Sequence, residues 1–517
     1  MNKPAQHLET LGGPLPVLPS RRAWPLFDAV ASRRIERAAL ACAEPHALMA
    51  SAGLGVARLA LAMAPHARRI WVAAGPGNNG GDGVVAGRFL HQRGLAVRIS
   101  LLGDAQRLPA DAMHALAQAQ QAGVPIDHQA TSHWADGTDA DLAIDALLGL
   151  GASRPPEGAL LQAVQQINAC AAQVLAVDLP TGLCGDTGRR LGDIAVRAHH
   201  TLALLTLKPG LFTAEGRDHA GRVWLDPLGV DTSPGPSSAL LIGPEFLRAA
   251  LPGRTHAQHK GSFGDVLVIG GAPGMGGAAL LASRAALTAG AGRVYLTRLD
   301  DNLAPDALRP ELMPRSVQAA LRPAMLAHTT VVCGCGGGDM VSDVLPQVLQ
   351  HAARLVLDAD ALNAVASDAA LRAALTDRQS RGQATVLTPH PLEAARLLGA
   401  NTAAVQADRL HQASTLADQF GCVVVLKGSG TVIAGPGHTP MINPTGNARL
   451  GTAGTGDVLA GWLGGLWSQM ANTSAWEAAA ASVWHHGWAA EQAGAGDPRL
   501  PLRANDLIEA MAQGRLA

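Results

Sequence analysis

The sequence predicts an α/β protein with two domains, each a largely parallel sheet covered by helices on both faces. The chain of 517 residues exceeds one ordinary core, and two domains of roughly 250 residues each are the natural division. Short apolar runs rich in β-forming residues alternate with stretches rich in Ala and Leu, which is typical of βαβ units. The alternation breaks once, at residues 231–238, which are rich in Pro, Gly and Ser. We therefore expect one domain over residues 1–235 and a second over residues 236–517.

In the first half of the chain, compact apolar runs indicate strands, and longer stretches rich in Ala and Leu indicate helices. The predicted strands are residues 70–74, 96–102, 142–145, 174–178 and 201–206. The predicted helices are residues 25–41, 47–64, 83–92, 110–122 and 158–169.

The same pattern restarts after the break. The predicted strands are residues 265–269, 293–297, 329–332, 354–358, 384–387, 422–427, 431–434 and 441–443, and the predicted helices include residues 277–289 and 457–470. Residues 427–443 indicate a hairpin-like meander at one end of this second sheet. The two halves share a structural class, but no short internal repeat.

Composition excludes several classes of partner and compartment. Charged residues make up 16% of the chain and the formal net charge is −1, which gives no support for nucleic acid or an acidic membrane as a partner. The six cysteines form no C-x-x-C pair, and Cys333 and Cys335 are too close for an ordinary disulfide, so we expect reduced thiols. Residues 1–16 lack the apolar core of a signal peptide, and no apolar run of 18 residues occurs. We expect a soluble, cytoplasmic protein.

Two glycine-rich segments in different halves carry the clearest functional signal. One is residues 75–83, with the sequence GPGNNGGDG, and the other is residues 451–457, with the sequence GTAGTGD. Each precedes a predicted helix, and glycine and a helix N-terminus together favour a phosphate group. Asp82 and Asp457 place a carboxylate beside each of these segments, which indicates a chemical role. The sequence therefore predicts two nucleotide sites, one in each domain.

The first segment matches the G-x-G-x-x-G dinucleotide pattern, but this motif alone is weak evidence. Polar residues also end three further predicted strands, and these ends converge on one crevice of an open parallel sheet. There Asn79, Asp145 and Thr181 offer oxygen ligands to a hard cation. The alternative is that Asp145 and Asp178 only cap the turns that follow their strands.

Residues 48–53, 75–83, 145–149 and 177–182 resemble, in sequence and in order, the N-terminal domain of the bifunctional NAD(P)H-hydrate repair enzymes. The resemblance covers most of residues 30–230 and implies a Rossmann-like epimerase that interconverts the R and S forms of NADHX and NADPHX. It implies a potassium ion held by Asn79, Asp145 and Thr181. The substrate-binding residues that it implies are Asn78, Asn79, Gly80, Gly81, Asp82, Gly149, Leu150, Gly151, Ala152, Ser153, Arg154, Pro155 and Asp178.

Two positions depart from the family pattern, which usually has threonine in place of Leu150 and often serine in place of Thr181. Asp178 is our candidate for the catalytic group of this domain. Inverting a carbon that bears a hydroxyl beside a ring nitrogen requires the hydroxyl to leave and to return on the other face. An acid/base group must then protonate and deprotonate it.

In the second glycine-rich segment, the backbone N–H groups of residues 453–456 form an anion hole at a helix start. Asp457 then takes a proton from a substrate hydroxyl as it attacks a phosphoryl group. The alternative is that Asp457 only caps the helix, which contributes roughly 0.5–1 kcal/mol. The glycines and hydroxyls of residues 427–431 favour the nucleotide interpretation.

Residues 250–515 resemble a ribokinase-like fold and, more narrowly, the C-terminal dehydratase domain of the same repair enzymes. The resemblance rests on the motifs at 259–264, 270–277, 387–393, 426–431 and 443–457. It implies an ADP-dependent (in some relatives ATP-dependent) dehydration of the S hydrate through a phosphorylated intermediate, with a Mg²⁺ requirement left open. The implied nucleotide-binding residues are Lys427, Gly428, Ser429, Gly430, Thr431 and Gly456, and the implied hydrate-binding residues are Ala278, Gly336, Gly338, His390 and Asp457.

Relatives usually have proline and leucine in place of Cys335 and Gly337, so we expect a more flexible loop here. For His390 we favour a substrate contact over proton transfer. Asp358 and Asp360 look like metal ligands, but turn capping explains them equally well and we assign them no metal.

One alternative function is a ribokinase-like small-molecule kinase with a non-catalytic nucleotide-binding module at its N-terminus, which would accumulate a stable phosphorylated product. A plain NAD dehydrogenase is a third interpretation, although Tyr295 is the only tyrosine and no hydride-transfer pair is evident. We expect small-molecule partners and a homo-oligomer.

Overall fold

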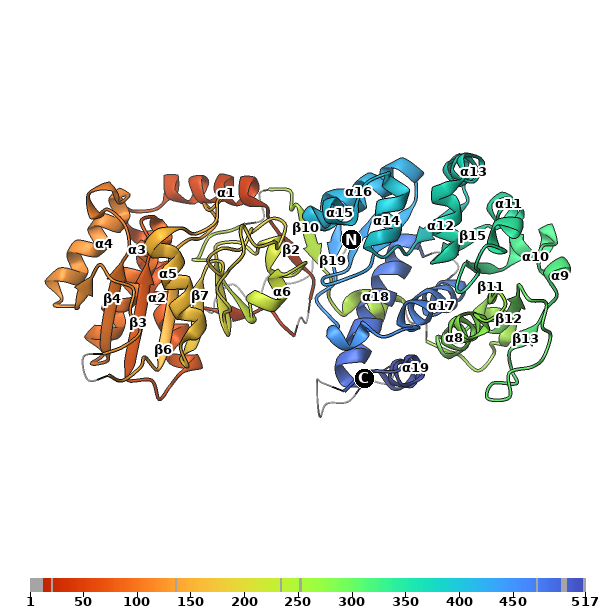
Figure 1. Cartoon of the computed structure of the whole chain (residues 1–517), viewed down its shortest axis with the longest axis horizontal. Helices are drawn as coiled ribbons and strands as arrows, with labels where there is room; N and C mark the ends of the chain where they lie inside the picture. The colour runs from red at the N-terminus through yellow and green to blue at the C-terminus, as the bar shows by residue number, and fades with distance from the viewer. Residues whose placement is uncertain are drawn as a thin grey trace. The chain divides into compact units, whose positions relative to one another are not determined.

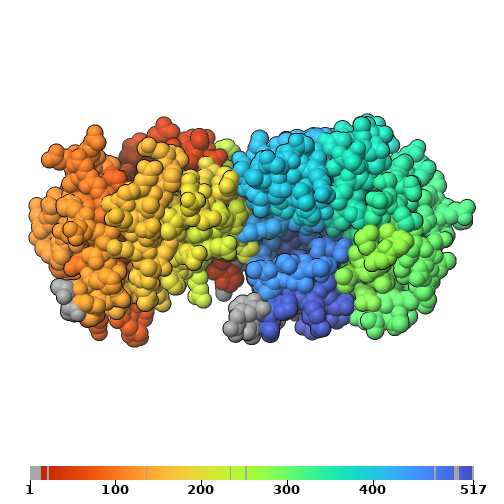
Figure 2. Space-filling model, viewed as in Figure 1, coloured from red at the N-terminus to blue at the C-terminus, as the bar shows by residue number. Residues whose placement is uncertain are grey.

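The structure is a computed structural model that describes residues 13–19, 22–134, 137–232, 235–250, 253–470, 473–493 and 500–514. The chain forms two compact units, one of residues 1–19 and 25–239 and the other of residues 20–24 and 240–517. In Figure 2, colours from red to yellow-green cover the first unit and colours from green to blue cover the second, so each unit is built from nearly one half of the chain. Within the expected linker, Ser233 and Pro234 lie outside the described residues, and Ser238 is anchored by its N–H, which donates to the Leu26 carbonyl at 2.8 Å.

The first unit contains an eight-stranded sheet in the order β1-β9-β8-β7-β6-β3-β4-β5, and only β1 is antiparallel to its neighbour. Its strands are β1 (Leu15–Pro16), β3 (Arg69–Ala74), β4 (Ala96–Leu101), β5 (Ile126–Asp127), β6 (Leu142–Ala146), β7 (Gln173–Val177), β8 (His200–Leu204) and β9 (Arg222–Asp226). Its helices are α1 (Ala29–Cys42), α2 (Ala47–Met63), α3 (Asn78–Gln92), α4 (Ala110–Gln121), α5 (Gly158–Ala169) and α6 (Gly216–His219), with 3₁₀ turns η1 (Ala105–Arg107) and η2 (Pro209–Leu211).

Alternation along β3 places side chains in two separate cores on opposite faces of this sheet. Ile70 and Val72 pack with α2, α3 and α4, whereas Trp71 and Ala73 pack with α5. The expected three-layer, Rossmann-like arrangement is therefore confirmed, and Figure 1 shows its central strands β3, β4, β6 and β7.

The predicted helix at residues 25–41 is wrong at its start. Residues Trp24–Leu26 form the short strand β2, and α1 begins only at Ala29. Asp28 sets this start, because its carboxylate caps the helix by accepting a hydrogen bond from the Ala31 N–H at 2.8 Å.

The second unit contains an eleven-stranded sheet in the order β13-β12-β11-β14-β15-β16-β17-β18-β19-β10-β2. Its remaining strands are β10 (Ala239–Leu241), β11 (Asp265–Gly270), β12 (Arg293–Arg298), β13 (Met313–Pro314), β14 (Thr330–Cys333), β15 (Arg354–Leu357), β16 (Ala384–Leu387), β17 (Val423–Leu426), β18 (Val432–Ala434) and β19 (Met441–Ile442). The predicted meander is confirmed as the antiparallel run β17-β18-β19, although β10 and β2 extend the sheet beyond it.

Helices cover both faces of this second sheet. They are α7 (Glu245–Ala250), α8 (Gly276–Thr288), α9 (Val317–Ala320), α10 (Pro323–His328), α11 (Val341–His351), α12 (Asp360–Ser367), α13 (Ala369–Ser380), α14 (Pro391–Leu398), α15 (Thr402–Ala407), α16 (Arg409–Phe420), α17 (Thr455–Ser468), α18 (Ala475–Gln492) and α19 (Ala504–Gln513), with η3 (Lys260–Phe263) and η4 (Ala448–Leu450). Leu267 and Ile269 of β11 pack with α11 to α14, and Val266 and Val268 pack with α8, α17 and α18. This three-layer arrangement is the expected ribokinase-like half.

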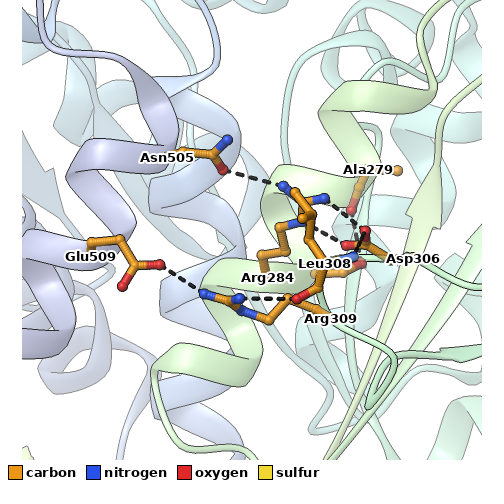
Figure 3. Close-up of polar contacts among 8 residues, drawn as sticks. Ala279, Arg284, Asp306, Leu308, Arg309, Asn505 and Glu509 are labelled. Atoms are coloured by element: carbon orange, nitrogen blue, oxygen red, sulfur yellow. Dashed lines mark hydrogen bonds and ion pairs between the residues drawn. The ribbon is translucent and has the colours of Figure 1, made fainter.

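One ion pair and one hydrogen bond join helix α19 to the rest of the second unit, as Figure 3 shows. Arg284 of α8 forms a two-bond contact with Asp306, with Nε–Oδ2 at 2.6 Å and Nη2–Oδ1 at 2.8 Å. Arg309 reaches Glu509 of α19 at 2.8 Å. The loop after β12 is thus fastened on one side to α8 and on the other to α19.

Each sheet has one place where the strand order reverses. In the first unit, β3 has β4 as its neighbour on one side and β6 on the other. In the second unit, β11 has β12 on one side and β14 on the other. Ligands of open α/β sheets bind beside the carboxyl ends of the strands at such a reversal. The two reversals therefore mark where a site is expected in each unit.

Candidate functional site

In the first unit, a cavity of about 480 Å³ opens beside the reversal between β3 and β6. It is lined by the segments that follow β3, β6 and β7 and by side chains of α1 and α2. The sequence-predicted residues among its lining are Asn78, Asn79, Asp82, Gly149, Leu150, Gly151, Ala152 and Asp178.

The glycine-rich segment of this site is not a loop as far as residue 83, as predicted, because α3 begins at Asn78. Because glycine has a low helix propensity, the sequence did not predict a helix start at Asn78. Asn79 and Asp82 are three residues apart, so they share a helix face that lines the cavity. Gly80 lies on the packed side, where an added methyl group would come 2.0 Å from the Gly75 carbonyl oxygen. Gly80 and, in the same way, Gly81 let the helix lie close to its neighbours.

Asp178 follows β7 in a left-handed conformation with φ of 66°, which is uncommon for a residue with a side chain. Its Oδ1 accepts hydrogen bonds from the Lys208 ammonium group and from the Leu204 N–H, the latter at 3.2 Å. Its Oδ2 accepts from the Leu150 N–H at 3.3 Å. The Lys208 side chain is 2% exposed and also donates to the Leu204 and Thr206 carbonyls, each at 2.9 Å. The Asp178 carboxylate is thereby held in one orientation at the cavity wall.

Asp145 and Thr181 are brought together as predicted. The Thr181 hydroxyl donates to Asp145 Oδ1 at 2.7 Å, and the Thr181 N–H donates to Oδ2 at 2.8 Å. Burial raises the pKa of Asp145 to about 6, while the hydrogen bonds from Thr181 act in the opposite direction. The Asp145 carboxyl thus accepts hydrogen bonds both from Leu147, in the turn after its own strand, and from Thr181, after β7.

Asn79 and Asp178 both lie close to Gly149 in the cavity wall. A methyl group on Gly149 would come 3.0 Å from Asn79 Oδ1 and 3.3 Å from Asp178 Oδ2. The buried Nδ2 of Asn79 has no hydrogen-bond partner within the described residues. The Asp145 carboxyl, the Thr181 hydroxyl and the Asn79 amide oxygen are the kinds of oxygen ligand that suit a hard monovalent cation.

Only part of the segment after β6 that was predicted to bind the substrate lines the cavity. Gly149, Leu150, Gly151 and Ala152 line the cavity, whereas Ser153, Arg154 and Pro155 are exposed and are not among its lining residues. At the position where relatives have a hydroxyl, Leu150 contributes its backbone N–H to Asp178 instead.

Sequence reasoning assigned no role to four charged residues of this cavity, which are Arg33, Glu36, Asp111 and Lys208. Burial, followed by the negative charge of Asp178, raises the pKa of Glu36. Lys208 was visible as a polar strand end, but Glu36 and Asp111 belong to α1 and α4, which carry no local motif.

In the second unit, helix α17 begins at Thr455 behind Gly454, whose φ is 88°. Gly454 occupies the N-cap position and provides no side-chain cap, and Asp457 is the acidic residue of the first helical turn. A methyl group on Gly456 would come 3.4 Å from Lys427 Nζ and 4.0 Å from Asp358 Oδ2. The first turn of α17 therefore faces Lys427 and Asp358.

Asp457 belongs to a cluster with Cys335 and Asp358, in which one sulfur or oxygen atom of each lies within 4.8 Å of the others. Lys427 Nζ pairs with Asp358 Oδ1 at 2.7 Å. Burial raises the pKa of Asp457 to about 6; the charge of Asp358 adds to this rise, and a hydrogen bond from the Cys335 thiol opposes it. Burial alone would lower the pKa of Lys427, but Asp358 and Glu393 raise it above its ordinary value.

Asp358 is thus a site residue to which sequence analysis gave no role. Ala359, with φ of 51°, turns the chain sharply after it, and Asp360 accepts a hydrogen bond from the Gly338 N–H at 2.9 Å. Asp358 therefore points to Lys427 and Asp360 points to the loop after β14.

His390 caps helix α14. Its Nδ1 accepts from the Leu392 and Glu393 N–H groups at 3.1 and 3.3 Å, so its proton is on Nε2, which lies 3.2 Å from Glu393 Oε1. Burial, opposed by the positive charge of Lys427, raises the pKa of Glu393 to about 7. Glu393 is a further site residue that sequence analysis missed.

The two loops at the second strand reversal touch each other. Gly336 has φ of 59°, and an added methyl group would come 2.9 Å from the Ala278 Cβ. The nucleotide-binding segment predicted at residues 427–431 follows β17, and Arg409 donates to the Leu426 and Lys427 carbonyls, each at 3.1 Å. Lys427, Gly456 and Asp457 are therefore gathered at one site with Asp358.

Among the helices of the described residues, none is by itself long and apolar enough to cross a membrane; only α1 and α2 taken together, with a bend of 115° between them, have the length and composition.

Comparison with known proteins assigns a family to both halves. Residues 45–210 match the family described as YjeF-related protein N-terminus, and residues 266–512 match the family described as NAD(P)H-hydrate dehydratase. The bifunctional NAD(P)H-hydrate repair enzyme of Coxiella burnetii is 36% identical over 485 residues, covering 92% of this chain and 96% of the relative. The Escherichia coli enzyme of the same name is 35% identical over 470 residues, covering 90% and 88%.

Among solved structures, the ADP/ATP-dependent NAD(P)H-hydrate dehydratase from Bacillus subtilis is 29% identical, with a TM-score of 0.45, and the match covers 53% of this chain and 97% of that protein. With both halves matched in order and nearly the full length of curated relatives covered, the chain belongs to the family of bifunctional NAD(P)H-hydrate repair enzymes.

Proposed function

We propose that the first unit epimerises the R and S hydrates of NADH and NADPH, and that the second unit dehydrates the S hydrate using ADP. One observation carries the proposal. Beside the carboxyl ends of the strands in each unit, an aspartate lies close to a lysine that forms an ion pair: Asp178 pairs with Lys208, and Asp457 lies beside the pair of Asp358 and Lys427. Each arrangement joins a proton-accepting carboxylate to a fixed positive charge.

In the first unit, the hydroxyl carbon of the substrate faces Asp178, between Asn79 and the segment 149–152. Asp178 exchanges the proton that the hydroxyl needs in order to leave and to return. Its three hydrogen bonds hold the carboxylate in place, so little reorganisation accompanies the reaction.

A potassium ion bound by Asn79, Asp145 and Thr181 completes this site in our proposal. The ion neutralises the Asp145 carboxylate, which pairs with no Lys or Arg side chain within the described residues. When bound, the ion would supply a fixed positive charge to the site.

In the second unit, the N–H groups at the start of α17 hold the terminal phosphoryl group of ADP, and residues 427–431 hold the rest of the nucleotide. The substrate hydroxyl attacks this phosphorus and gives its proton to Asp457, the O–P bond forms, and AMP leaves. The C–O bond then breaks, phosphate leaves, a proton leaves the neighbouring carbon, and the ring double bond of NAD(P)H forms. Asp457 suits the role because its pKa of about 6 keeps it ionised at neutral pH and still basic.

Mixed R and S hydrates, incubated with the purified protein and followed by chromatography, separate the two activities. With no nucleotide, the epimers should interconvert; with ADP, both should be converted to NAD(P)H with release of phosphate. ATP replaces ADP in one arm, and Mg²⁺ and K⁺ are omitted in turn. A stable phosphorylated product would instead indicate a small-molecule kinase.

Two variants assign the activities to the units. Asp178→Asn should lower epimerisation by about 10²–10⁴-fold and leave dehydration intact, and Asp457→Asn should do the reverse. The matched controls are Asp104→Asn and Asp418→Asn, which alter exposed aspartates outside both sites. If either variant lost both activities or neither, this division of labour would be wrong.

We also propose that the protein is a cytoplasmic homo-oligomer without a nucleic-acid or membrane partner. Its six free cysteines and a net charge of −1 support this. Light scattering of the purified protein tests the oligomeric state, and fractionation of cells tests the cytoplasmic location.

A further inference from the structure

Two carboxyl groups of the first cavity lie on different elements and have opposite surroundings. Asp178 at the end of β7 is paired with Lys208 and accepts two backbone hydrogen bonds. Asp82 lies on α3, on the helix face that it shares with Asn79, and lines the same cavity. Within the described residues, no hydrogen bond or ion pair reaches the Asp82 carboxyl. One group is therefore a charged acceptor, and the other lacks any partner that would stabilise its charge.

The charges around Asp82 are mainly negative. Burial raises its pKa well above the ordinary range, and the charges of Asp178, Glu36 and Asp111 raise it further. The nearby cationic side chains pair with another carboxyl group or are exposed.

Two of the described cationic side chains line this cavity: Lys208 donates to Asp178, and Arg33 is exposed on α1. The ring of His46, which is not among the lining residues, contacts Asp111 at 2.6 Å. None of them pairs with Asp82 within the described residues. Asp82 thus lines, without a partner for its carboxyl group, the same cavity as Asp178, whose carboxyl group is paired with Lys208.

We infer that Asp82 and Asp178 form an acid–base pair for epimerisation, in which Asp82 gives a proton to the departing hydroxyl and Asp178 takes one from the water that returns. The inference rests on the proposed epimerase function of the first unit. Two carboxyl groups whose surroundings separate their proton affinities are a recurrent way to obtain an acid and a base in one site.

The atoms and electrons balance without another reactant. The C–O bond breaks as the oxygen takes the Asp82 proton and leaves as water, and the lone pair of the ring nitrogen forms a C=N⁺ bond. Water then adds to the opposite face of that carbon, the C=N⁺ pair returns to nitrogen, and the proton released goes to Asp178. Proton exchange with solvent restores both groups, and the reverse reaction uses them with their roles exchanged.

The test compares wild type, Asp82→Asn, Asp82→Glu and the exposed control Asp104→Asn in epimerisation assays from pH 5 to pH 10. Because Asp82 must be protonated, wild-type kcat should fall as pH rises through its pKa. Asp82→Asn should lower kcat by about 10²–10⁴-fold, change KM by less than about threefold and abolish this alkaline limb. Asp82→Glu should restore part of the rate together with a shifted limb.

A second measurement follows the oxygen atom. In H₂¹⁸O, each wild-type epimerisation should place one ¹⁸O atom in the product hydroxyl, and Asp82→Asn should show only the spontaneous rate of incorporation. Circular dichroism and urea unfolding of the first unit verify that each variant is folded.

The outcomes separate this inference from the proposed function. If wild type does not epimerise the hydrates, the proposed function fails. If wild type epimerises them and Asp82→Asn retains its kcat and its alkaline limb, or changes only KM, then Asp82 is not the acid and this inference alone fails.

Discussion

The aspartates proposed for catalysis in the two units have different neighbours, and these set their chemistry. Asp178 contacts the Lys208 ammonium group directly, whereas Asp457 faces the carboxylate of Asp358, whose partner is Lys427. Like charge and burial together raise the pKa of Asp457 to about 6. Asp457 is therefore ionised at neutral pH and remains a useful proton acceptor.

Replacing Cys335 with alanine should shift the pH dependence of dehydration. The rate should fall in wild type as pH falls below about 6, because Asp457 becomes protonated. The Cys335 thiol donates a hydrogen bond that opposes this protonation, so its loss should move the acid limb upward by roughly one pH unit. kcat profiles measure the shift, with Cys333→Ala as the control. An unmoved limb in Cys335→Ala would show that the thiol does not tune Asp457.

Asp145 should make the stability of the first unit depend on pH. Its pKa is raised from 3.8 to about 6, so its stabilising contribution is complete below pH 3.8 and is lost as pH rises through 6. A shift of this size corresponds to about 3 kcal/mol. Urea unfolding at pH 4 and pH 7.5 without potassium should reveal the difference, and Asp145→Asn should reduce it. Adding KCl in place of tetramethylammonium chloride at pH 7.5 should recover stability in wild type only.

At the scale of elements, helix α3 combines a packing face and a functional face within its first two turns. Asn78, Asn79 and Asp82 line the cavity, while the intervening glycines allow the helix to approach β3 and its neighbours. The helix start thus places three polar side chains in the cavity, while Gly80, Gly81 and Gly83 allow close packing on its other side.

Gly80→Ala should disturb this arrangement, and Gly77→Ala should not. A methyl group on Gly80 would lie 2.0 Å from the Gly75 carbonyl oxygen, whereas one on Gly77 meets nothing within 4 Å. We expect Gly80→Ala to destabilise the first unit by roughly 1–3 kcal/mol and to impair epimerisation. Denaturant unfolding and the epimerase assay check both effects; equal behaviour of the two variants would contradict this account of the packing.

The contacts that fasten α8 and α19 should differ in strength. The Arg284 and Asp306 side chains are 15% and 5% exposed, whereas those of Arg309 and Glu509 are 39% and 61% exposed. A double-mutant cycle should therefore give roughly 1–3 kcal/mol of coupling for the first pair and less than about 1 kcal/mol for the second. Similar values for both pairs would show that burial does not decide the strength of these contacts.

At the scale of the whole molecule, one architectural principle is used twice. Each unit has a mainly parallel sheet with helices on both faces, and each places its candidate catalytic carboxylate beside the carboxyl ends of parallel strands. Because each unit has its own cores, each should respond to its own ligands.

Calorimetry should therefore reveal two unfolding transitions with different ligand responses. K⁺ should raise the transition of the first unit and ADP that of the second, each by about 2.7 kcal/mol of stability at a hundred times the dissociation constant. Asp145→Asn should remove the first response and leave the second. A single transition that shifts equally with both ligands would contradict independent units.

Local patterns in the sequence determined the fold class, the two halves and the glycine-rich segments, since strand and helix periodicity and turn chemistry depend on near neighbours. They did not reveal that α3 begins at Asn78, because helix propensity argues against a start among glycines that only close packing explains. Nor did these patterns predict that Glu36 of α1 lines the cavity. They also did not predict the pairs Lys208–Asp178 and Lys427–Asp358, whose members are 30 and 69 residues apart in the chain. Those contacts depend on the order of strands in each sheet, which no local segment of the chain specifies and which only the tertiary structure decides.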